Sequence, residues 1–511
     1  MEQNYDNFDW VLYIDEYSLK QDISDKENAW NYFQNIGKSN NHIYYNIHQR
    51  GEFERMRDNF DWELYLNTYE DVKNHGTNGI YATWWHYNHF GKDKGYQYFS
   101  LSNNSLQPSN VVGPDDLVMV YHEPVDKEVN VYYYVDHVIN TDLRSGIQVL
   151  TIYIAKYLLK KKINIVFVKW DNSNNQMVPC TVSNIHHMFN YRNAGEIIPP
   201  ISYTNYSPIH YNSDYPHSKF VLFIPELTFS RENYVEKIKK YTKMYSIKNI
   251  FVLYDIIPLV LQDYYDSSGI FKKYLTENLL HCDKIISISN FTKNEFEKYC
   301  NTNGFKIPKI SSILLPNQFR DTSRIIQEDS VINQEKIVIL LPGTIEPRKQ
   351  QILFMRMFLK FINFNPDYKV ELVVYGQVVD SFKGTVNDLV SKSNGHIIYL
   401  GLISDEQIRE LYKIASFLCF ISIYEGYGFP VSESLWNGVP VLTSNSGSMA
   451  EIAVAGGCFT INTSKKEEIY NAIDILIKEP KHLSTLREQI KNTHLSTWSQ
   501  YTDCIYRELI E

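Results

Sequence analysis

Strand-like runs alternate with helical runs twice along this chain, and no other sequence feature restricts the fold as strongly. The first series of strand-like runs is VNVYYYVDHV (129–138), INIVFVKW (163–170), KFVLFIPEL (219–227), NIFVLYDIIP (249–258) and DKIISISN (283–290). The helical stretch GIQVLTIYIAKYLLKK separates the first two. The pattern restarts near residue 336 with KIVILLPG, KVELVVYG, HIIYLG, SFLCFIS and VPVLTS.

This double alternation predicts two parallel sheets, each covered by helices. We therefore expect two consecutive doubly wound domains with a hinge near ILLPN (313–317). Ligands of such sheets bind beyond the carboxyl ends of the strands. Two sheets that face each other would hold a ligand in the cleft between them.

The first hundred residues contain an internal duplication. NFDW occurs at 7–10 and again at 59–62, and AWNYFQNIGK (29–38) resembles TWWHYNHFGK (83–92). The repeats predict two copies of a small, aromatic-rich helical unit. Either the pair is structural, with aromatic side chains in one shared core, or it is a docking module for an acceptor or partner.

Composition excludes several classes of function. A net charge of −9 without a basic block argues against a nucleic-acid binder. The six cysteines form no C-x-x-C pair, which indicates reduced thiols in a cytosol-like compartment. The polar N-terminus is not a signal peptide, and no apolar run reaches the roughly 20 residues that span a bilayer. We expect a soluble cytoplasmic protein with at most peripheral membrane contact.

The segment YEGYGFPVSESLWNGVPVLTS (424–444) is the most specific motif of the chain. Glu425 and Glu433 flank a glycine-rich turn that enters a helix expected to begin near Ser432. Such a turn lets backbone N–H groups approach a ligand, and the helix N-terminus favours phosphate oxygens. Glu433, expected in the first turn, is suited to accept hydrogen bonds from a ribose diol.

This segment resembles the E-G-[FY]-G-x-P-x-x-E motif of the retaining GT-B glycosyltransferases of family 4, in particular their mannosyltransferase-like branch. Other segments agree in order: LRSGIQ (143–148), YDIIP (254–258), SISNFTKNE (287–295), LPNQ (315–318), GTIEPRKQQ (343–351) and GSMAE (447–451). Tyr254 stands where the family has His. The resemblance covers about residues 129–500 and leaves the repeats unexplained.

The resemblance implies a fold and a domain organisation. The fold is α/β of the GT-B type, with two Rossmann-like doubly wound domains facing a cleft, preceded by a small, mainly helical repeat module. The expected parts are the repeat module (1–100), a linker (101–128), an acceptor-side Rossmann-like domain (129–335), a nucleotide-sugar-binding Rossmann-like domain (336–490) and a C-terminal helix packing back on the catalytic unit (491–511).

The resemblance also implies a donor site. Arg348 and Lys349, after the strand that ends at Gly343, would clamp the diphosphate. Gly146 would let the opposite backbone close on the phosphates. The further residues implied are Glu425 near the donor sugar, the amides of Gly428 and Phe429 on its hydroxyls, Glu433 on the ribose, Asp255 as a catalytic candidate, and His137 as a secondary candidate.

The expected reaction is transfer of a hexose from a nucleotide sugar, GDP-mannose or a UDP-sugar, to a glycan or glycoconjugate acceptor with retention. No Asp-x-Asp motif occurs in the chain, so we expect no metal and no cofactor. The alternatives are a non-catalytic glycan-binding or structural protein with a GT-B fold, a nucleotide-sugar epimerase, and a phosphorylase. The oligomeric state is left open.

Overall fold

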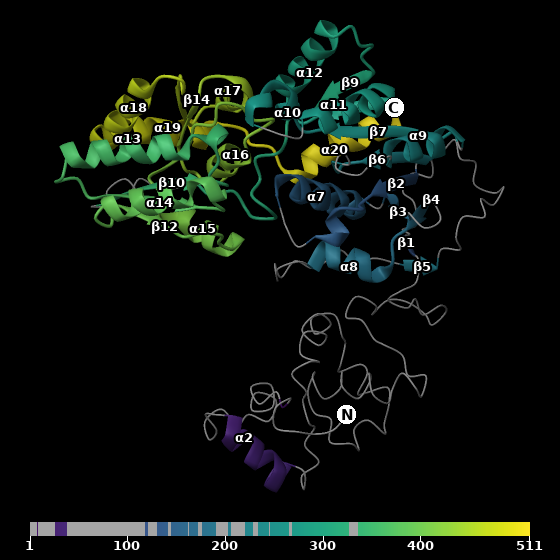
Figure 1. Cartoon of the computed structure of the whole chain (residues 1–511), viewed down its shortest axis with the longest axis horizontal. Coiled ribbons are helices and arrows are strands. Elements are labelled where there is room, and N and C mark those ends of the chain that lie inside the picture. The colour runs from purple at the N-terminus through teal and green to yellow at the C-terminus, as the bar shows by residue number, and fades with distance from the viewer. Residues whose placement is uncertain are drawn as a thin grey trace. The chain divides into compact units, whose positions relative to one another are not determined.

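A computed structural model gives the structure of the chain (Figure 1). It describes residue 8 and residues 26–37, 118–120, 130–141, 145–161, 163–171, 176–190, 203–205, 220–227, 234–244, 246–264, 268–326 and 336–511. The chain divides into two units, residues 1–113 and 114–511. In the described parts, no helix is both long and apolar enough to cross a membrane.

In the first unit, the structure describes Phe8, α2 (Lys26–Tyr32) and the π-helical turn η1 (Phe33–Gly37). The ring of Phe8 lies 5.2 Å from that of Trp30 and 5.4 Å from that of Phe33. Phe8 of the NFDW motif and the Trp30 and Phe33 rings of the AWNYF motif therefore form one aromatic cluster. The second repeat lies outside the described residues, as does most of the predicted linker, so the duplicated module stays a prediction.

The second unit begins with a mixed sheet, of which the described residues form nine strands in the order β5-β1-β3-β2-β6-β7-β8-β9, with β4 beside β3. The parallel strands are β2 (Asn130–Tyr134), β3 (Asn164–Asp171), β6 (Phe220–Ile224), β7 (Lys248–Leu253), β8 (Lys284–Ser287) and β9 (Lys309–Ser312). The first five confirm the predicted strand–helix alternation, whereas β9 was not predicted and its residues are half-buried or exposed.

One edge of this sheet corrects the prediction of an all-parallel arrangement. The antiparallel strands there are β1 (Val118–Val120), β4 (Gln176–Pro179) and β5 (Tyr203–Asn205). β1 lies within 101–128, the range predicted as a linker, so part of that range belongs to the sheet. These strands have only three or four residues, too few for a periodic sequence signal.

The helices around this sheet are α7 (Gly146–Lys160), α8 (Val182–Asn190), α9 (Tyr234–Met244), α10 (Ile257–Val260), α11 (Ser268–Glu277) and α12 (Asn290–Thr302). Short 3-10 turns are η6 (Val138–Asn140), η8 (Gln262–Tyr264) and η9 (Leu279–His281). Ser145 caps α7 in a capping box with Gln148, which satisfies N–H groups at the helix start.

The second sheet is parallel, and its described strands follow the order β12-β11-β10-β13-β14-β15. They are β10 (Ile337–Pro342), β11 (Val370–Tyr375), β12 (Ile397–Tyr399), β13 (Phe417–Phe420), β14 (Val441–Ser444) and β15 (Cys458–Ile461). Counted along the chain this is the Rossmann order, which reverses direction between β10 and β13.

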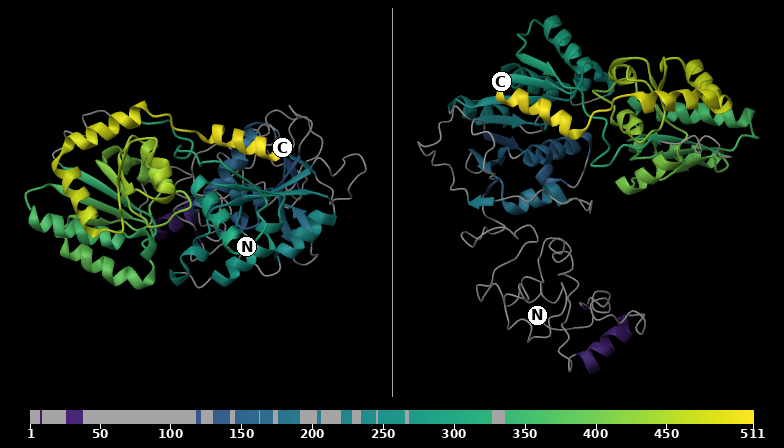
Figure 2. Two further views of the ribbon diagram at one scale, coloured as in Figure 1. Left: turned by 90° about the horizontal axis from the view of Figure 1, so that it is seen from above. Right: turned by 180° about the vertical axis from the view of Figure 1, so that it is seen from behind.

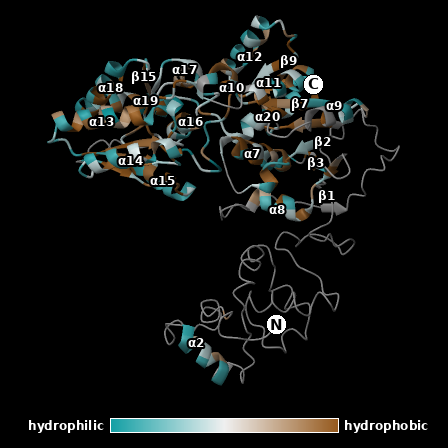
Figure 3. Ribbon diagram, in the orientation of Figure 1, coloured by the Kyte–Doolittle hydropathy of each residue, from teal (hydrophilic) through white to brown (hydrophobic). Residues whose placement is uncertain are grey.

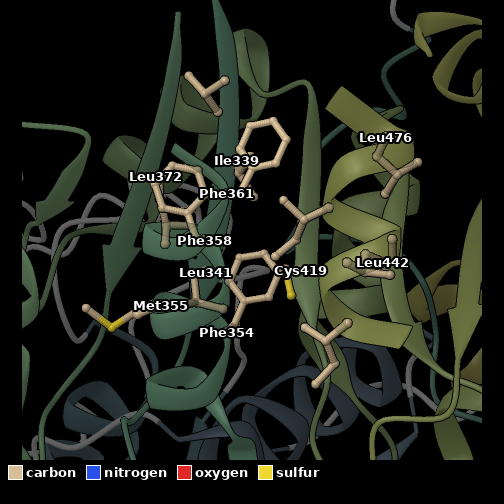
Figure 4. Packing of buried hydrophobic residues seen from close by; sticks show 14 of the residues in the cluster. Ile339, Leu341, Phe354, Met355, Phe358, Phe361, Leu372, Cys419, Leu442 and Leu476 are labelled. Atoms are coloured by element: carbon tan, nitrogen blue, oxygen red, sulfur yellow. The ribbon is translucent and has the colours of Figure 1, made fainter. Parts of the chain in front are cut away.

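The helices of this lobe are α13 (Gln351–Phe364), α14 (Asp380–Lys392), α15 (Asp405–Ile414), α16 (Phe429–Trp436), α17 (Gly447–Ala453), α18 (Lys466–Lys478) and α19 (Pro480–Asn492). Phe354, Phe358 and Phe361 of α13 pack with Ile339 of β10 (Figure 4). Each such buried side chain contributes about 1.5–3 kcal/mol. Hydrophobic residues concentrate along the strands, while hydrophilic residues recur along α18 and α19 (Figure 3).

The chain passes between the lobes twice. It leaves the N-terminal lobe after β9 and returns after α19 to form α20 (Trp498–Ile510), which lies beside α7 (Figure 2). Asn317 and Ser496 of the two passages share hydrogen bonds, with the Asn317 N–H donating to the Ser496 carbonyl at 3.0 Å. We call residues 118–312 with α20 the N-terminal lobe, and residues 336–492 the C-terminal lobe.

Candidate functional site

The reversal point of the second sheet is where the predicted site residues of the C-terminal lobe converge. β10 and β13 are adjacent parallel strands, so the loops that follow them leave the same sheet edge. The first loop, from Gly343 to Gln350, carries Arg348 and Lys349. The second loop, from Ile421 to Gly428, carries Glu425. Rossmann-like sheets bind nucleotides at such a point.

Arg348 joins these two loops. Its Nη1 lies 2.7 Å from Glu425 Oε2 and donates to the Tyr424 carbonyl at 2.6 Å, and its Nη2 donates to Glu346 Oε1 at 2.6 Å. The sequence leaves open whether Arg348 is exposed, and the structure buries it, with 10% of its side chain accessible. The guanidinium thus holds both loops in one geometry and stays charged between two carboxylates.

Lys349 stands next to Gly343. Gly343 has φ +95, and a Cβ atom there would lie 3.4 Å from Lys349 Nζ. Lys349 also lies 3.8 Å from Glu346 Oε1. Gln350 adopts the left-handed region at φ +56, which turns the chain sharply into α13. The Lys349 ammonium therefore lies next to the Gly343 backbone at the carboxyl end of β10.

The carboxylate of Glu425 has one committed and one uncommitted oxygen. Oε2 is paired with Arg348, whereas Oε1 is buried and accepts no hydrogen bond from any described residue. An unsatisfied buried acceptor costs about 1–3 kcal/mol. A ligand hydroxyl at this position would remove that cost.

Gly428 and Phe429 begin α16, which corrects the expected helix start near Ser432. Gly428 is the N-cap residue at φ +120, and Pro430 lies in the first turn, where its missing N–H has no cost. Glu433 consequently lies in the second turn of the helix. The Phe429 ring contacts Gly146 at the start of α7, because a Cβ atom on Gly146 would lie 3.0 Å from Phe429 Cδ2.

Glu433 is paired with a cation from outside its own segment. Arg320 Nη1 lies 3.1 Å from Glu433 Oε1, while Arg320 also binds Asp405 through Nε at 2.7 Å and Nη2 at 3.1 Å. Burial raises the pKa of Glu433 to about 7, Arg320 opposes that rise and the negative charge of Asp405 adds to it. Protonation of this carboxyl therefore occurs near neutral pH.

Asp255, at the end of β7, lies against the loop that carries Glu425. A Cβ atom on Gly426 would lie 3.1 Å from the Asp255 Cβ. Asp255 Oδ1 accepts a hydrogen bond from the Ile257 N–H at 2.9 Å. Burial raises the pKa of Asp255 to about 6, and the charge of Glu425 adds to the rise, whereas the Ile257 bond and Arg348 lower it.

Tyr254, next to Asp255, directs its side chain into the N-terminal lobe. Its side chain is buried, and its hydroxyl donates to the Pro225 carbonyl at 2.6 Å beneath α7. Burial raises its pKa well above the usual value. The phenol is therefore bound to backbone acceptors within the N-terminal lobe.

His137 is exposed, at the carboxyl side of β2. Its Nδ1 lies 3.0 Å from Gln148 Nε2, and Gln148 Oε1 accepts from the Ser145 N–H at 2.9 Å. Because the amide oxygen is used by Ser145, the amide nitrogen donates to Nδ1, and the neutral ring carries its proton on Nε2.

The lobes also meet through backbone groups. The Gly426 carbonyl accepts hydrogen bonds from Ser289 Oγ at 2.6 Å and Thr292 Oγ1 at 3.0 Å. Glu451 of α17 accepts from the N–H groups of Asn290 and Phe291, each at 3.0 Å. A carboxylate at the start of α12 also suits the helix dipole.

Sequence reasoning missed several of these residues. Glu346 directly precedes Pro-Arg-Lys, and its position beside two cations could have marked it. Glu226 follows β6, and its carboxylate accepts the N–H groups of His137 and Val138, each at 2.7 Å. Arg320 and Asp405 have no local signal, because they meet Glu433 only in the folded chain. Among the described residues, no group of three His, Cys, Asp or Glu could hold a metal ion.

Comparison with known proteins finds similarity to glycosyltransferases. Residues 322–493 match the family model described as "Glycosyl transferases group 1". O-antigen chain mannosyltransferase B of Escherichia coli is 27% identical over 196 residues, which cover 36% of this chain and 49% of that protein. O-antigen chain mannosyltransferase RfbU of Salmonella typhimurium is 22% identical over 240 residues, covering 47% and 63%. The chain thus spans about half to two thirds of these relatives.

Solved structures show the same fold. The Anabaena protein Alr3699/HepE, in complex with UDP and glucose, superposes with a TM-score of 0.52 at 13% identity, covering 75% of this chain and 99% of that one. Sucrose-phosphate synthase from Thermosynechococcus elongatus gives 0.50 at 14% identity, with the same coverage. The predicted GT-B architecture of two Rossmann-like domains is confirmed. This chain therefore carries a glycosyltransferase group 1 domain, built into a GT-B fold.

Proposed function

We propose that this protein is a retaining, metal-independent glycosyltransferase of family 4. In this proposal it transfers a hexose from a nucleotide diphosphate sugar to a hydroxyl group of a glycan or glycoconjugate. The observation that carries the proposal is the Arg348–Glu425 ion pair of 2.7 Å at the reversal point of the sheet, with Lys349 beside Gly343. This pairing brings cations for a diphosphate next to an uncommitted acceptor for a sugar hydroxyl.

The cations would stabilise the departing nucleotide. Glu346, Arg348, Lys349 and Glu425 carry two negative and two positive charges, so their cluster is neutral before a ligand arrives. Lys349 makes only a 3.8 Å contact with Glu346, and we expect its ammonium to move to the phosphate oxygens. Charge that develops on the leaving phosphate is then neutralised in a partly buried site.

Glu425 would orient the donor sugar. Its Oε1 would accept a hydrogen bond from a sugar hydroxyl, while Arg348 fixes the carboxylate through Oε2. The bond between the anomeric carbon and the phosphate oxygen breaks as the acceptor oxygen attacks from the same face. The acceptor proton passes to the departing phosphate, so the reaction needs no separate protein base. The backbone N–H groups of Gly428 and Phe429 would face the donor at the start of α16.

The donor proposal follows from the relatives. The names of the matching proteins specify mannosyl transfer, so GDP-mannose is the first candidate. The HepE structure holds UDP and glucose, which makes a UDP-sugar the second candidate. O-antigen assembly in the relatives favours a glycan or glycoconjugate acceptor.

The test is incubation of the whole protein with a panel of GDP- and UDP-sugars, with and without glycan acceptors, while released nucleotide is measured. We expect release from one donor, stimulated by acceptor, and a product whose anomeric proton coupling shows retention. Inversion would refute the mechanism. Nucleotide binding without release would support a non-catalytic protein, and conversion of the sugar while it stays bound to nucleotide would support an epimerase.

A further inference from the structure

We infer that Arg320 is a positioning residue, which holds the carboxylate of Glu433 in place for the ribose of the donor. The inference rests on the proposed function, because it assigns a role within the same site. Arg320 belongs to the passage between the lobes and lies outside every motif that predicts the site.

The geometry of the guanidinium fixes its role. Nε and Nη2 form a two-pronged contact with Asp405 at 2.7 and 3.1 Å, which orients the planar group against the start of α15. The remaining edge directs Nη1 to Glu433 Oε1 at 3.1 Å. The Phe319 ring supports the guanidinium from one face, at 4.9 Å from the centroid. Arg320 itself adopts the left-handed region at φ +50.

The contact leaves Glu433 able to bind a ligand. Arg320 donates a hydrogen bond to Oε1 of Glu433. No described residue forms a hydrogen bond or an ion pair with Oε2. An ionised carboxylate offers acceptor sites on both oxygens, whereas a protonated one turns one oxygen into a donor. A ribose diol needs acceptors, so the ionised form is the binding form.

The surroundings of Glu433 oppose ionisation unless Arg320 is present. Only 14% of the Glu433 side chain is accessible. The charged and titratable groups around it are Arg320, Asp405, Tyr375, Tyr412 and Tyr427. Asp405 is negative, and burial raises the pKa of each of the three tyrosines, which are neutral at physiological pH. Arg320 is therefore the cation in this group that favours the carboxylate.

Arg320 also connects the site to the passage between the lobes. The next residue, Asp321, binds Lys156 and accepts a hydrogen bond from the Tyr157 hydroxyl at 2.8 Å, and both partners belong to α7. The adjacent residues Arg320 and Asp321 thus contact opposite lobes. The position of Glu433 is in this way fixed relative to the N-terminal lobe as well as to α15.

The test measures the affinity of GDP and UDP by calorimetry from about pH 6 to about pH 8.5 for the whole protein and its variants. In the wild type we expect binding to weaken as pH falls through the Glu433 titration. Arg320→Gln should move this midpoint upward by about one pH unit, so that the loss at the acid end grows by up to about tenfold. Arg320→Lys should restore part of the shift. In a Glu433→Gln background, Arg320→Gln should produce no pH-dependent change.

The matched control is Arg324→Gln. Arg324 lies in the same segment, but it donates to backbone carbonyls, those of Thr493 at 2.8 Å and Ile490. We expect any loss of nucleotide affinity in this variant to be equal at all pH values. The inference would be overturned if Arg320→Gln lost nucleotide affinity by the same factor at all pH values. Tighter binding by Arg320→Gln at every pH would also overturn it.

A second measurement separates this inference from the proposed function. Thermal unfolding without nucleotide, for the wild type, both single variants and the double variant, tests the ion pair directly. We expect Arg320→Gln to lower the melting temperature more at about pH 8 than at about pH 5.5, and only when Glu433 is present. If this coupling is seen but neither nucleotide binds, the proposed function fails. If nucleotide binds without the coupling, the positioning role fails.

Discussion

A Cβ atom on Gly426 would lie 2.0 Å from the carbonyl oxygen of Tyr254. Gly426 belongs to the loop after β13 and Tyr254 to the loop after β7, so the glycine lets the backbones of the two lobes touch. The Gly426 carbonyl is also the acceptor for Ser289 and Thr292. The loop that carries Glu425 is thereby fixed against the N-terminal lobe.

Gly426→Ala should consequently displace this loop from the N-terminal lobe. We expect a loss of stability of about 1–3 kcal/mol, typical of overpacking, and a fall in sugar transfer of at least about tenfold. Thermal unfolding and a transfer assay measure the two effects. Gly384→Ala is the matched control, because nothing lies within 4 Å of a Cβ atom there and the site is inside α14. Unchanged transfer by Gly426→Ala would mean that the contact is not needed.

Replacement of Arg348 by Ala should cost about 2–4 kcal/mol of transition-state stabilisation, or roughly 10²–10³ in rate. The loss should be non-additive with Glu425→Ala, because each residue positions the other through the 2.7 Å ion pair. Lys349→Ala should show a loss of similar size. Steady-state kinetics on a double-mutant cycle provide the measurement. Lys383→Ala, which removes only an exposed pair with Asp380, should keep full activity.

Donor binding and stability should respond to pH in opposite directions. Glu433 has a pKa of about 7, raised from 4.5, so its ionised form is gained as pH rises through 7. We expect kcat/KM for the donor to rise through that window while kcat changes little, because a ribose contact is similar in ground and transition states.

Stability has the reverse sign. The folded state binds the Glu433 proton more tightly than the unfolded chain, so this contribution is fully present below about pH 4.5 and is lost as pH rises through 7. Asp255 acts likewise, between its usual value of 3.8 and about 6. Glu433→Gln should remove both the rise of kcat/KM through pH 7 and the contribution of Glu433 to the pH dependence of stability. A pH profile of kcat/KM that is the same in Glu433→Gln and wild type would contradict this assignment.

Donor turnover should persist in excess EDTA, because in the proposed mechanism Arg348 and Lys349 would supply the cations that the diphosphate requires. The measurement that tests this prediction is nucleotide release before and after EDTA is added. Loss of turnover that Mn²⁺ or Mg²⁺ restores would refute the proposed clamp. An assay of a metal-dependent glycosyltransferase in the same buffer verifies that chelation is complete.

Residues 1–113 should be separable from the rest, because the chain divides at Gly113. A chain that starts at residue 114 should fold, bind GDP or UDP and slowly hydrolyse the donor. If the repeats recruit acceptor, transfer should fall far more than hydrolysis. Phe8→Ala should disrupt the cluster with Trp30 and Phe33 and reproduce the effect of truncation. An insoluble truncated chain would refute this separability.

Local sequence signals identified most of the parallel strands, because each of those strands is a buried apolar run that ends at a turn. They missed β9 and β15, whose residues are mostly half-buried or exposed. They also identified the loops with Glu425 and Arg348, since glycine and proline spacing defines such turns. The start of α16 was misplaced, because Pro430 is compatible with a first helical turn as well as with a loop. Likewise, the sequence does not reveal that the Tyr254 hydroxyl is directed toward Pro225.

The features that the sequence does not predict depend on contacts between segments that are distant in the sequence. The antiparallel strand β1 is defined by its partners β3 and β5, which follow it by many residues. Arg320 meets Glu433 only because the passage between the lobes lies over α15 and α16. A single sequence contains both residues but carries no periodic pattern that pairs them.

The placement of α20 has a consequence for synthesis on the ribosome. The N-terminal lobe needs Trp498, whose ring packs at an angle against that of Tyr153 of α7, with the ring centroids 4.7 Å apart. It also needs Glu508, which pairs with Lys284, a fully buried cation on β8. Until α20 emerges, after the entire C-terminal lobe, Lys284 lacks Glu508, and the side of α7 that carries Tyr153 lacks Trp498. The first lobe to be translated is therefore the last to be completed, and the nascent chain has to remain free of aggregation during that interval.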